Sequence, residues 1–286
     1  MPDFGLDLTD ARSIIRVALD EDFAYGPDIT SVATVGDGQR STAKIVSREH
    51  GVIAGSALIG EVLREVCKSE DFEVTVAIED GQSVIPGDVV ATIECGTRNL
   101  LAAERTLLNL LTHLSGIATA TAAWVEATKS TKTKIRDSRK TLPGMRKLQK
   151  YAVRAGGGEN HRMGLGDRAM IKDNHVAAAG SVTSALRCVR HEFPDVWCEV
   201  EVDTLAQLDE VLILKPDEVL LDNFDLWEVQ VAVQRRNALS PDTLLEVSGG
   251  LTIDKAADLA NCGVDFLAVG ALTHSVRTLD LGLDFE

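Results

Sequence analysis

Two histidines, two arginines and a lysine fall within one glycine-rich window of the chain, residues 156–175 (GGGENHRMGLGDRAMIKDNH). Glycine removes side-chain bulk, so the backbone there can approach a ligand closely. Arginine pairs with a carboxylate or a phosphate through two parallel hydrogen bonds, and lysine acts as a point charge. The window therefore predicts a binding site for an anionic small molecule.

The distribution of charge along the chain supports that prediction. The 286 residues have a formal net charge of −15. Residues 132–175 hold twelve of the 29 Lys and Arg residues but only four acids, so this segment has a net charge of +8 and the rest −23. Several uncompensated cations in one cleft are destabilising, so we expect a ligand with several negative charges. Lys147 and Lys150, on a helix predicted over 145–154, are instead expected to be solvent-exposed.

Composition excludes several classes of partner. An acidic chain with 4% aromatic residues is a poor candidate for binding nucleic acid or an anionic membrane. The five cysteines are scattered and odd in number, which favours free, buried thiols in a reducing cytoplasm over disulfides or a zinc site. The first residues contain no basic segment followed by an apolar run, so no signal peptide is predicted.

The first part of the chain mixes helical and strand periodicity, which predicts an α+β unit of about a hundred residues. Helices are expected in LTDARSIIRVALDEDF, capped by Thr9 or Asp10, and in SALIGEVLREV. Strands are expected in STAKIVSRE, in FEVTVAIEDG and at the end of EDGQSVIPGDVVATIECG. The apolar stretch 100–124 includes charged residues, so it predicts one helix or a pair of helices against the core rather than a membrane span.

From Thr133 onward, short aliphatic runs alternate with helical stretches. The expected strands are TKIRDS, RAMIKD, CEVEVD, EVLLDN, LLEVSG and DFLAVG, with a further one near 159–162. Such alternation predicts a parallel sheet, and the absence of GxGxxG after its first strand favours an incomplete α/β barrel over a doubly wound sheet. The predicted fold class is thus α/β: an N-terminal α+β sandwich domain (1–115) plus the barrel (116–278), with the tail 279–286 free to pack back on the first domain.

Polar or glycine residues end each of these strands. The steps between the strand ends Lys172, Glu201, Asp222, Ser248 and Gly270 are 29, 21, 26 and 22 residues, each about one βα unit. In a barrel these positions meet at the C-terminal face, where such enzymes place their sites. The glycine-containing ends of the last two strands, near Ser248 and Gly270, are suited to bind a phosphate. The carboxylates of Glu201 and Asp222 are suited to bind Mg²⁺ together with phosphate oxygens.

Each of these residues also has a purely structural interpretation. Lys172 fits a solvated loop lysine, Glu201 or Asp222 fits a helix N-cap, and His161 fits a hydrogen-bonded core histidine. From spacing alone, Arg105 is expected to pair on the surface of its helix.

The segment RDSRKTLPGMRKLQKYAVRAGGGENHRMGLGDRAMIKDNHV resembles the quinolinate phosphoribosyltransferase family, and in particular its actinobacterial form. The resemblance extends over essentially the whole chain, through DEDFAYGPDITS, AERTLLNLLTHLSGIAT, EVEVD, LLDN, EVSGG and LAVGALTHS. It implies the type II phosphoribosyltransferase fold and Mg²⁺ as cofactor. It also implies phosphoribosyl transfer from phosphoribosyl pyrophosphate to quinolinate with decarboxylation, which gives nicotinate mononucleotide, CO₂ and pyrophosphate in de novo NAD synthesis.

The resemblance further implies a role for individual residues. Those implied to bind quinolinate are Arg139, His161, Arg162 and Lys172, with Arg105 entering from the partner subunit of a homodimer. Those implied to bind phosphoribosyl pyrophosphate are Ser138, Arg139, Lys140, Glu201, Asp222, Ser248, Gly249, Gly250, Val269, Gly270 and Ala271. Lys140, Glu201 and Asp222 are implied to be catalytic, and the two acids to bind Mg²⁺ directly or through water.

Other functions stay open at this point. One is a Schiff-base enzyme with Lys172 as the nucleophile, and another is the molybdenum-transport-associated paralogue of the family. A carrier domain in residues 79–96 is disfavoured because the exposed lysine turn of such carriers is missing. The sequence leaves open the kinetic order, the closure of any loop, the assembly of dimers into hexamers, and the roles of Glu159 and His175.

Overall fold

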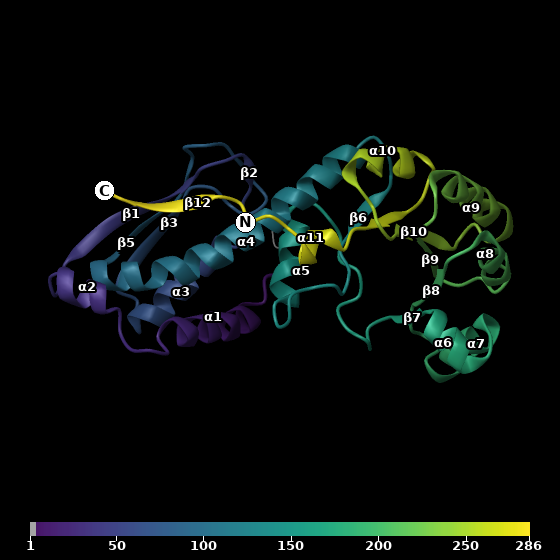
Figure 1. Cartoon of the computed structure of the whole chain (residues 1–286), viewed down its shortest axis with the longest axis horizontal. Helices are drawn as coiled ribbons and strands as arrows, with labels where there is room; N and C mark the ends of the chain where they lie inside the picture. The colour runs from purple at the N-terminus through teal and green to yellow at the C-terminus, as the bar shows by residue number, and fades with distance from the viewer. Residues whose placement is uncertain (1–3) are drawn as a thin grey trace. The chain divides into compact units, whose positions relative to one another are not determined.

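The computed structural model describes residues 4–286, which divide into two compact units (Figure 1). The first unit holds the described residues up to Ala122 together with Thr141–Gly157 and Ala271–Glu286. The second holds Ala123–Lys140 and Gly158–Gly270. Both units are discontinuous in sequence, unlike the contiguous domains 1–115 and 116–278 expected above, whose boundaries stay a prediction.

The first unit is built on an antiparallel sheet with strand order β12-β1-β5-β3. The C-terminal strand β12 lies at its edge, with Leu283 opposite Ile45 of β1. Ile45 and Ile93 are fully buried and contribute to the core of this unit. Its elements are α1 (Leu8–Asp22), α2 (Ile29–Thr34), β1 (Arg40–Ser47), β2 (Gly51–Val52), α3 (Ala57–Cys67), β3 (Phe72–Val76), β4 (Ser83–Val84), β5 (Val89–Gly96), most of α4 (Thr97–Thr128), α5 (Arg146–Ala155), α11 (Ala271–His274) and β12 (Leu281–Phe285).

Two details of this unit differ from the sequence-based prediction or sharpen it. Helix α1 is capped by Asp7, whose Oδ1 accepts the backbone N–H groups of Thr9 and Asp10 at 3.0 and 3.1 Å. The prediction of Thr9 or Asp10 as the N-cap was therefore wrong: Asp7 is the N-cap residue, because its carboxylate accepts the first free N–H groups of the helix. The apolar stretch 100–124 lies within the single helix α4, which has 32 residues.

Helix α5 corrects the expectation that Lys147 and Lys150 are both solvated. Lys147 is exposed and pairs with Asp7 at 2.9 Å, as expected of a surface lysine. Lys150, however, is fully buried. The helix buries most of its residues, including Gln149, whose Nε2 donates to the carbonyl of Thr273 at 2.9 Å. Local charge density therefore did not indicate which face of the helix meets solvent.

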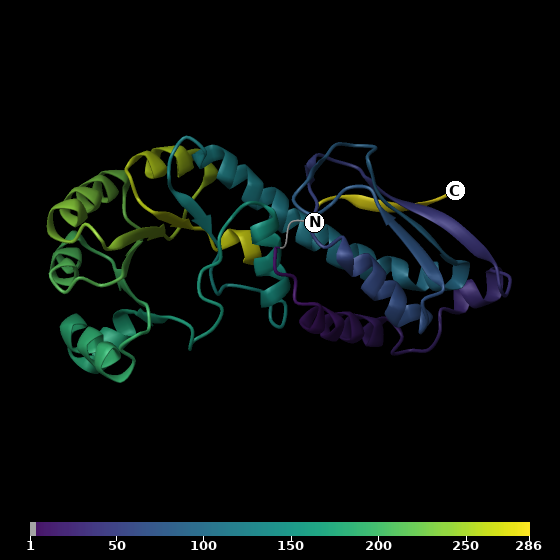
Figure 2. The same cartoon turned by 180° about the vertical axis from the view of Figure 1, so that it is seen from behind.

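The second unit is built on a six-stranded parallel sheet with strand order β6-β11-β10-β9-β8-β7. Its helices form an arc outside the sheet (Figures 1 and 2). Its elements are β6 (Lys134–Arg136), β7 (Ala169–Ile171), α6 (Asp173–Ala179), α7 (Val182–Glu192), β8 (Cys198–Val202), α8 (Leu205–Leu212), β9 (Glu218–Asp222), α9 (Leu226–Leu239), β10 (Leu244–Ser248), α10 (Ile253–Asn261) and β11 (Phe266–Ala268).

The two faces of this sheet differ in chemistry. Residues at alternate positions, such as Val200, Val219 and Leu245, are fully buried and apolar, as expected beneath covering helices. The positions between them include Glu199 and its register partner Glu218. Because side chains alternate across a strand, these acids lie on the inner face of the curved sheet.

The sheet does not close into a complete barrel. Strands β6 and β7 are its two edges and do not pair with each other. Glu159 forms an isolated parallel bridge with Arg136 of β6, and its N–H donates to the carbonyl of Ile135 at 2.8 Å. Residues 160–168 then reach β7 without regular secondary structure. The predicted strand near 159–162 is thus reduced to one bridge, and the predicted incomplete α/β barrel is confirmed.

Among residues 4–286, no helix combines the length and the hydropathy that a membrane crossing requires. All five cysteines are free. Cys95 and Cys198 are buried, whereas Cys188 is exposed, so the expectation of buried thiols holds for only part of the set.

Candidate active site

A pocket of about 270 Å³ opens at the C-terminal ends of the strands of the second unit. It brings together residues from all six strands or from the positions that follow them, and from the segment 160–162. Its lining residues are Ser138, Arg139, Lys140, His161, Arg162, Met170, Lys172, Glu201, Leu220, Asp222, Glu246, Ser248, Ala268 and Gly270. Most of the residues singled out from the sequence therefore share one cavity.

The remaining predicted site residues lie elsewhere. Arg105 is exposed on α4 in the first unit. Gly249 and Gly250 line a neighbouring pocket of about 550 Å³ with helices α9 and α10. Val269 is buried, and its N–H donates to the carbonyl of Arg136 at 2.8 Å. Ala271 begins α11 in the first unit.

Arg162 is the most deeply buried cation of the pocket wall, with 9% of its surface exposed. Its Nη1 donates to the carbonyl of Arg168 at 3.3 Å, and its Nη2 contacts Sδ of Met170 at 3.6 Å. Burial lowers the pKa of this guanidinium, and the positive charge of Arg139 lowers it further. Both effects favour an anion beside the two arginines.

The opposite side of the pocket has two half-buried carboxylates, Glu201 and Asp222. Oε2 of Glu201 accepts a charged hydrogen bond from Nζ of Lys172. Oδ2 of Asp222 accepts from the side-chain amide of Asn223 at 2.8 Å. Carboxylates that face phosphate oxygens are the donor set that Mg²⁺ prefers, so these two residues fit that ion.

The loops after β9 and β10 interlock beside the pocket. The N–H of Asn223, a residue with φ of 56°, donates to the carbonyl of Ser248 at 2.9 Å. Gly249 has a φ of 91°, and a Cβ on it would lie 2.3 Å from Oδ1 of Asn223. Only glycine fits that approach and that conformation. The sequence SGG thus fixes where the backbone passes the pocket.

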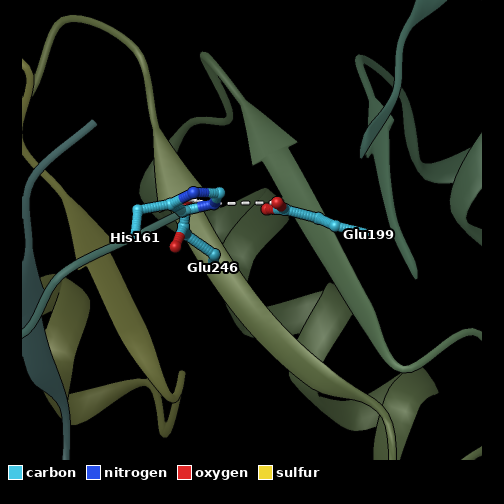
Figure 3. A group of neighbouring side chains, drawn as sticks. All are labelled: His161, Glu199 and Glu246. Atoms are coloured by element: carbon cyan, nitrogen blue, oxygen red, sulfur yellow. Dashed lines mark hydrogen bonds and ion pairs between the residues drawn. The ribbon is translucent and has the colours of Figure 1, made fainter. Parts of the chain in front are cut away.

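Beneath these groups lies a layer of buried polar and charged side chains, which we call the pocket floor and define as Arg136, His161, Glu199, Glu218 and Glu246. Of these five residues, the sequence analysis identified only His161. Arg136 pairs with Glu218 and, at 3.0 Å, with Glu246. Nε2 of His161 lies 2.8 Å from Oε2 of Glu199 and 3.7 Å from Oε1 of Glu246. The imidazole points at the Glu199 carboxylate, with Glu246 beside it (Figure 3).

Burial dominates the electrostatics of the floor. It raises the pKa of Glu246 to about 8, and the negative charge of Glu199 adds to the shift. Burial likewise raises the pKa of Glu199 to about 8, together with the charge of Glu218. The sequence could have indicated these residues, because side chains two positions apart on a strand lie on the same face. Glu199 precedes Glu201 by two positions, and Glu246 precedes Ser248 by two.

Two residues that the sequence left unplaced have structural positions. Nδ1 of His175 accepts the N–H of Lys172 at 3.0 Å, which caps the start of α6. Glu159 is exposed and lines a different pocket with Thr133 and Lys134, at the amino ends of the strands. Its carboxylate is therefore separate from the anion pocket.

Two family models match the chain. The Quinolinate phosphoribosyl transferase C-terminal domain matches residues 117–284, and the corresponding N-terminal domain matches residues 28–115. Among curated relatives, the carboxylating nicotinate-nucleotide pyrophosphorylase of Mycobacterium leprae is 58% identical over 274 residues, which cover 96% of each chain. A decarboxylating quinolinate phosphoribosyltransferase of Nicotiana tabacum is 35% identical, over 97% of this chain and 83% of the relative.

Solved structures agree with these matches. The nicotinate-nucleotide pyrophosphorylase of Francisella tularensis superposes with a TM-score of 0.92 at 36% identity, over 98% of each chain. That of Ehrlichia chaffeensis superposes with a TM-score of 0.92 at 35% identity, over 99% of this chain and all of that one.

Proposed function

The chain belongs to the quinolinate phosphoribosyltransferase family, and from this premise we propose how its strand-end pocket performs the family's reaction. The reaction transfers the phosphoribosyl group of phosphoribosyl pyrophosphate to quinolinate and releases pyrophosphate and CO₂, leaving nicotinate mononucleotide for NAD synthesis. The observation that carries the proposal is the meeting of five cationic or imidazole side chains with the carboxylates of Glu201 and Asp222 in one pocket of about 270 Å³.

Quinolinate occupies the cationic side of this pocket in our proposal. Its two adjacent carboxylates match two guanidinium forks, which Arg139 and Arg162 supply, and a point charge, which Lys172 supplies. Binding there also offsets the repulsion between the two arginines. His161 lies next to Arg162 and contributes its ring to the same wall.

Phosphoribosyl pyrophosphate occupies the part of the pocket that Lys140, Glu201 and Asp222 line. Its pyrophosphate faces Lys140, whose backbone N–H donates to Oγ of Ser138 at 3.1 Å. Its 5′-phosphate lies at residues 248–250 and 269–271, where glycines let the backbone approach a ligand closely. The close approach of Gly249 to Asn223 supports a fixed backbone at that position.

Glu201 and Asp222 would hold Mg²⁺, directly or through water. When bound, the ion neutralises the charge of the departing pyrophosphate. The same carboxylates face the anomeric carbon, where departure of pyrophosphate develops positive charge as in glycoside chemistry, and they stabilise that charge electrostatically.

The ring nitrogen of quinolinate is the nucleophile, so the protein needs none. After the new C–N bond forms, the nitrogen is positively charged and the adjacent C2 carboxylate leaves as CO₂, with the electron pair left at C2 taking up a proton. The cations of the pocket hold the other carboxylate and orient the ring.

Two further proposals concern assembly and location. We propose that Arg105, exposed on α4, enters the pocket of a partner subunit in a homodimer. We also propose that the enzyme works in the cytoplasm, a reducing compartment in which its five free thiols are stable. The Schiff-base alternative has less support, because the Nζ of Lys172 is held by Glu201.

The test is an assay of nicotinate mononucleotide formation from phosphoribosyl pyrophosphate with quinolinate or with nicotinate, each with and without Mg²⁺. We expect product from quinolinate only, and only with the ion. Product from nicotinate alone would exclude the proposed reaction, and the absence of product from quinolinate would favour the molybdenum-transport-associated paralogue.

A further inference from the structure

Arg162 poses a structural problem, because a residue that orients a substrate must itself be held in place. It lies within the segment 160–168, which has no regular secondary structure and follows the single bridge at Glu159. Nevertheless both Arg162 and the preceding His161 are at least nine-tenths buried. Something other than a helix or a sheet ladder therefore fixes this part of the pocket wall.

Two acids from the neighbouring strands hold the segment. Asp137, which follows β6 and is fully buried, accepts the N–H of His161 at 2.9 Å and the side-chain amide of Asn160 at 2.6 Å. Glu199 of β8 contacts the ring of His161 at 2.8 Å. Asp137 thus fixes the backbone, and Glu199 fixes the side chain.

The hydrogen bonds of the ring assign its tautomer. Nδ1 of His161 accepts the backbone N–H of Arg162 at 2.7 Å, so Nδ1 carries no proton. A neutral imidazole must carry one proton, which therefore sits on Nε2 and is donated to Oε2 of Glu199. Rotation of the ring away from Glu199 would break the contact with the Arg162 backbone as well.

We propose that Glu199 is a positioning residue: by holding the Nε2–H tautomer of His161, it fixes the backbone of Arg162 and thereby the cations that bind the dicarboxylate. This inference rests on the proposed function, since it assigns quinolinate to that wall. Glu199 itself stays beneath the pocket, with 1% of its surface exposed, and touches no substrate.

The same three side chains, His161, Glu199 and Glu246, lie close enough together to suggest a metal site instead. The tautomer argues against it, because an ion on Nε2 would need the position that the proton occupies. A cation is also already present, since Arg136 pairs with Glu246 at 3.0 Å. The floor is thus a hydrogen-bond network in which His161 carries a proton on Nε2 and Arg136 supplies the positive charge.

The experiment compares two substitutions of Glu199. Glu199→Gln keeps an oxygen acceptor for Nε2–H, whereas Glu199→Leu removes it at similar volume. We expect Glu199→Leu to raise the KM for quinolinate by about tenfold to a hundredfold, as for a misplaced binding group, and Glu199→Gln to raise it by less than about threefold. The KM for phosphoribosyl pyrophosphate should stay within about twofold in both, because its predicted contacts include neither His161 nor Arg162.

Asp265→Asn is the matched control, because Asp265 also pairs with a buried arginine, Arg236, at 2.8 Å, but at the amino end of its strand. It should change neither KM. If Glu199→Leu raises both KM values equally, or if Glu199→Gln is as impaired as Glu199→Leu, the positioning role is wrong.

A measurement on the unsubstituted protein keeps the inference testable even if Glu199→Leu does not fold. The ¹⁵N chemical shifts of the His161 ring, assigned by loss of the signal in His161→Asn, should show Nε2 protonated and Nδ1 unprotonated. A protonated Nδ1 would overturn the inference. This outcome is independent of turnover, so it is distinguishable from failure of the proposed reaction, which would appear as no product from quinolinate.

Discussion

The mouth of the pocket, which we define as Arg139, Arg162, Lys172, Glu201 and Asp222, and the pocket floor behave as two different environments. On β8, Glu201 at the mouth has 15% of its side chain exposed and pairs with Lys172, which is 41% exposed. Glu199, two residues earlier, has 2% of its side chain exposed and pairs with His161. Groups at the mouth can exchange their partners for a ligand, whereas Glu199 and Glu218 at the floor do not line the pocket and cannot reach one. A spacing of two residues on β8 thus separates a ligand-binding position from one that supports the pocket from beneath.

The largest expected effect comes from the mouth. Arg162→Ala should abolish turnover and weaken quinolinate binding by about 10²-fold or more, because two charge-assisted hydrogen bonds of about 1.5–3 kcal/mol each are lost. Isothermal titration calorimetry with quinolinate measures the change. Near-normal affinity in the variant would show that Arg162 does not bind quinolinate.

A backbone change at the mouth should come next. Gly249→Ala places a Cβ 2.3 Å from Oδ1 of Asn223 at a φ of 91°. Strain of roughly 1–3 kcal/mol should displace the loop and raise the KM for phosphoribosyl pyrophosphate by about tenfold. Gly180→Ala is the matched control, because Gly180 has a φ of 86° with nothing within 4 Å of the added Cβ. Equal effects in steady-state kinetics would show that the close approach is unimportant.

Glu246, at the floor, should affect the stability of the protein. The pKa of Glu246 rises from 4.5 to about 8 in the native state because the carboxyl group is fully buried. Between these values the native state holds a proton that the unfolded state has released, so raising the pH favours unfolding. Between about pH 6 and about pH 7.5 this group should cost about 1–2 kcal/mol of stability.

Urea unfolding at both pH values tests this expectation in the unsubstituted protein and in Glu246→Gln, which cannot titrate. The substituted protein should lose less stability as the pH rises. If the free energy of unfolding changes equally with pH in both proteins, Glu246 is ionised in the native state. The floor would then not differ from the mouth in the ionisation of its carboxyl groups.

The smallest effect concerns a cation of the basic segment that belongs to neither environment. Lys147 is half-exposed and pairs with Asp7 and Asp10 at 2.9 and 3.5 Å. Lys147→Ala should leave the midpoint of urea unfolding and both KM values nearly unchanged, because exposed ion pairs contribute little to stability. A raised KM in the kinetic assay would show that the positive charge of the segment acts beyond the pocket.

The mouth was predictable from the sequence, and the floor, apart from His161, was not. Strand-end positions such as Lys172, Glu201 and Asp222 follow from the spacing of βα units, and these residues do line one pocket. Glu199 and Glu246 stand inside strands that the sequence analysis treated as apolar. Their burial depends on partners elsewhere in the fold, Arg136 of β6 and His161 of the segment 160–168, whose pairing no local pattern reveals.

The same reason explains the other differences between sequence and structure. Lys150 was expected in solvent because local charge was high, but the packing of α5 buries it. The interior of the helix was set by tertiary contacts rather than by composition. Arg105 shows the converse, since its predicted role depends on a partner subunit and no feature of the single chain tests it.

A crystal structure of the chain with quinolinate tests the central claim most directly. The account predicts the ligand in the strand-end pocket, with its carboxylates within hydrogen-bond distance of Arg139, Arg162 and Lys172, and with His161 still donating from Nε2 to Glu199. Quinolinate bound instead in the pocket between α9 and α10, or a His161 ring turned away from Glu199 toward the ligand, would contradict the division into a binding mouth and a supporting floor.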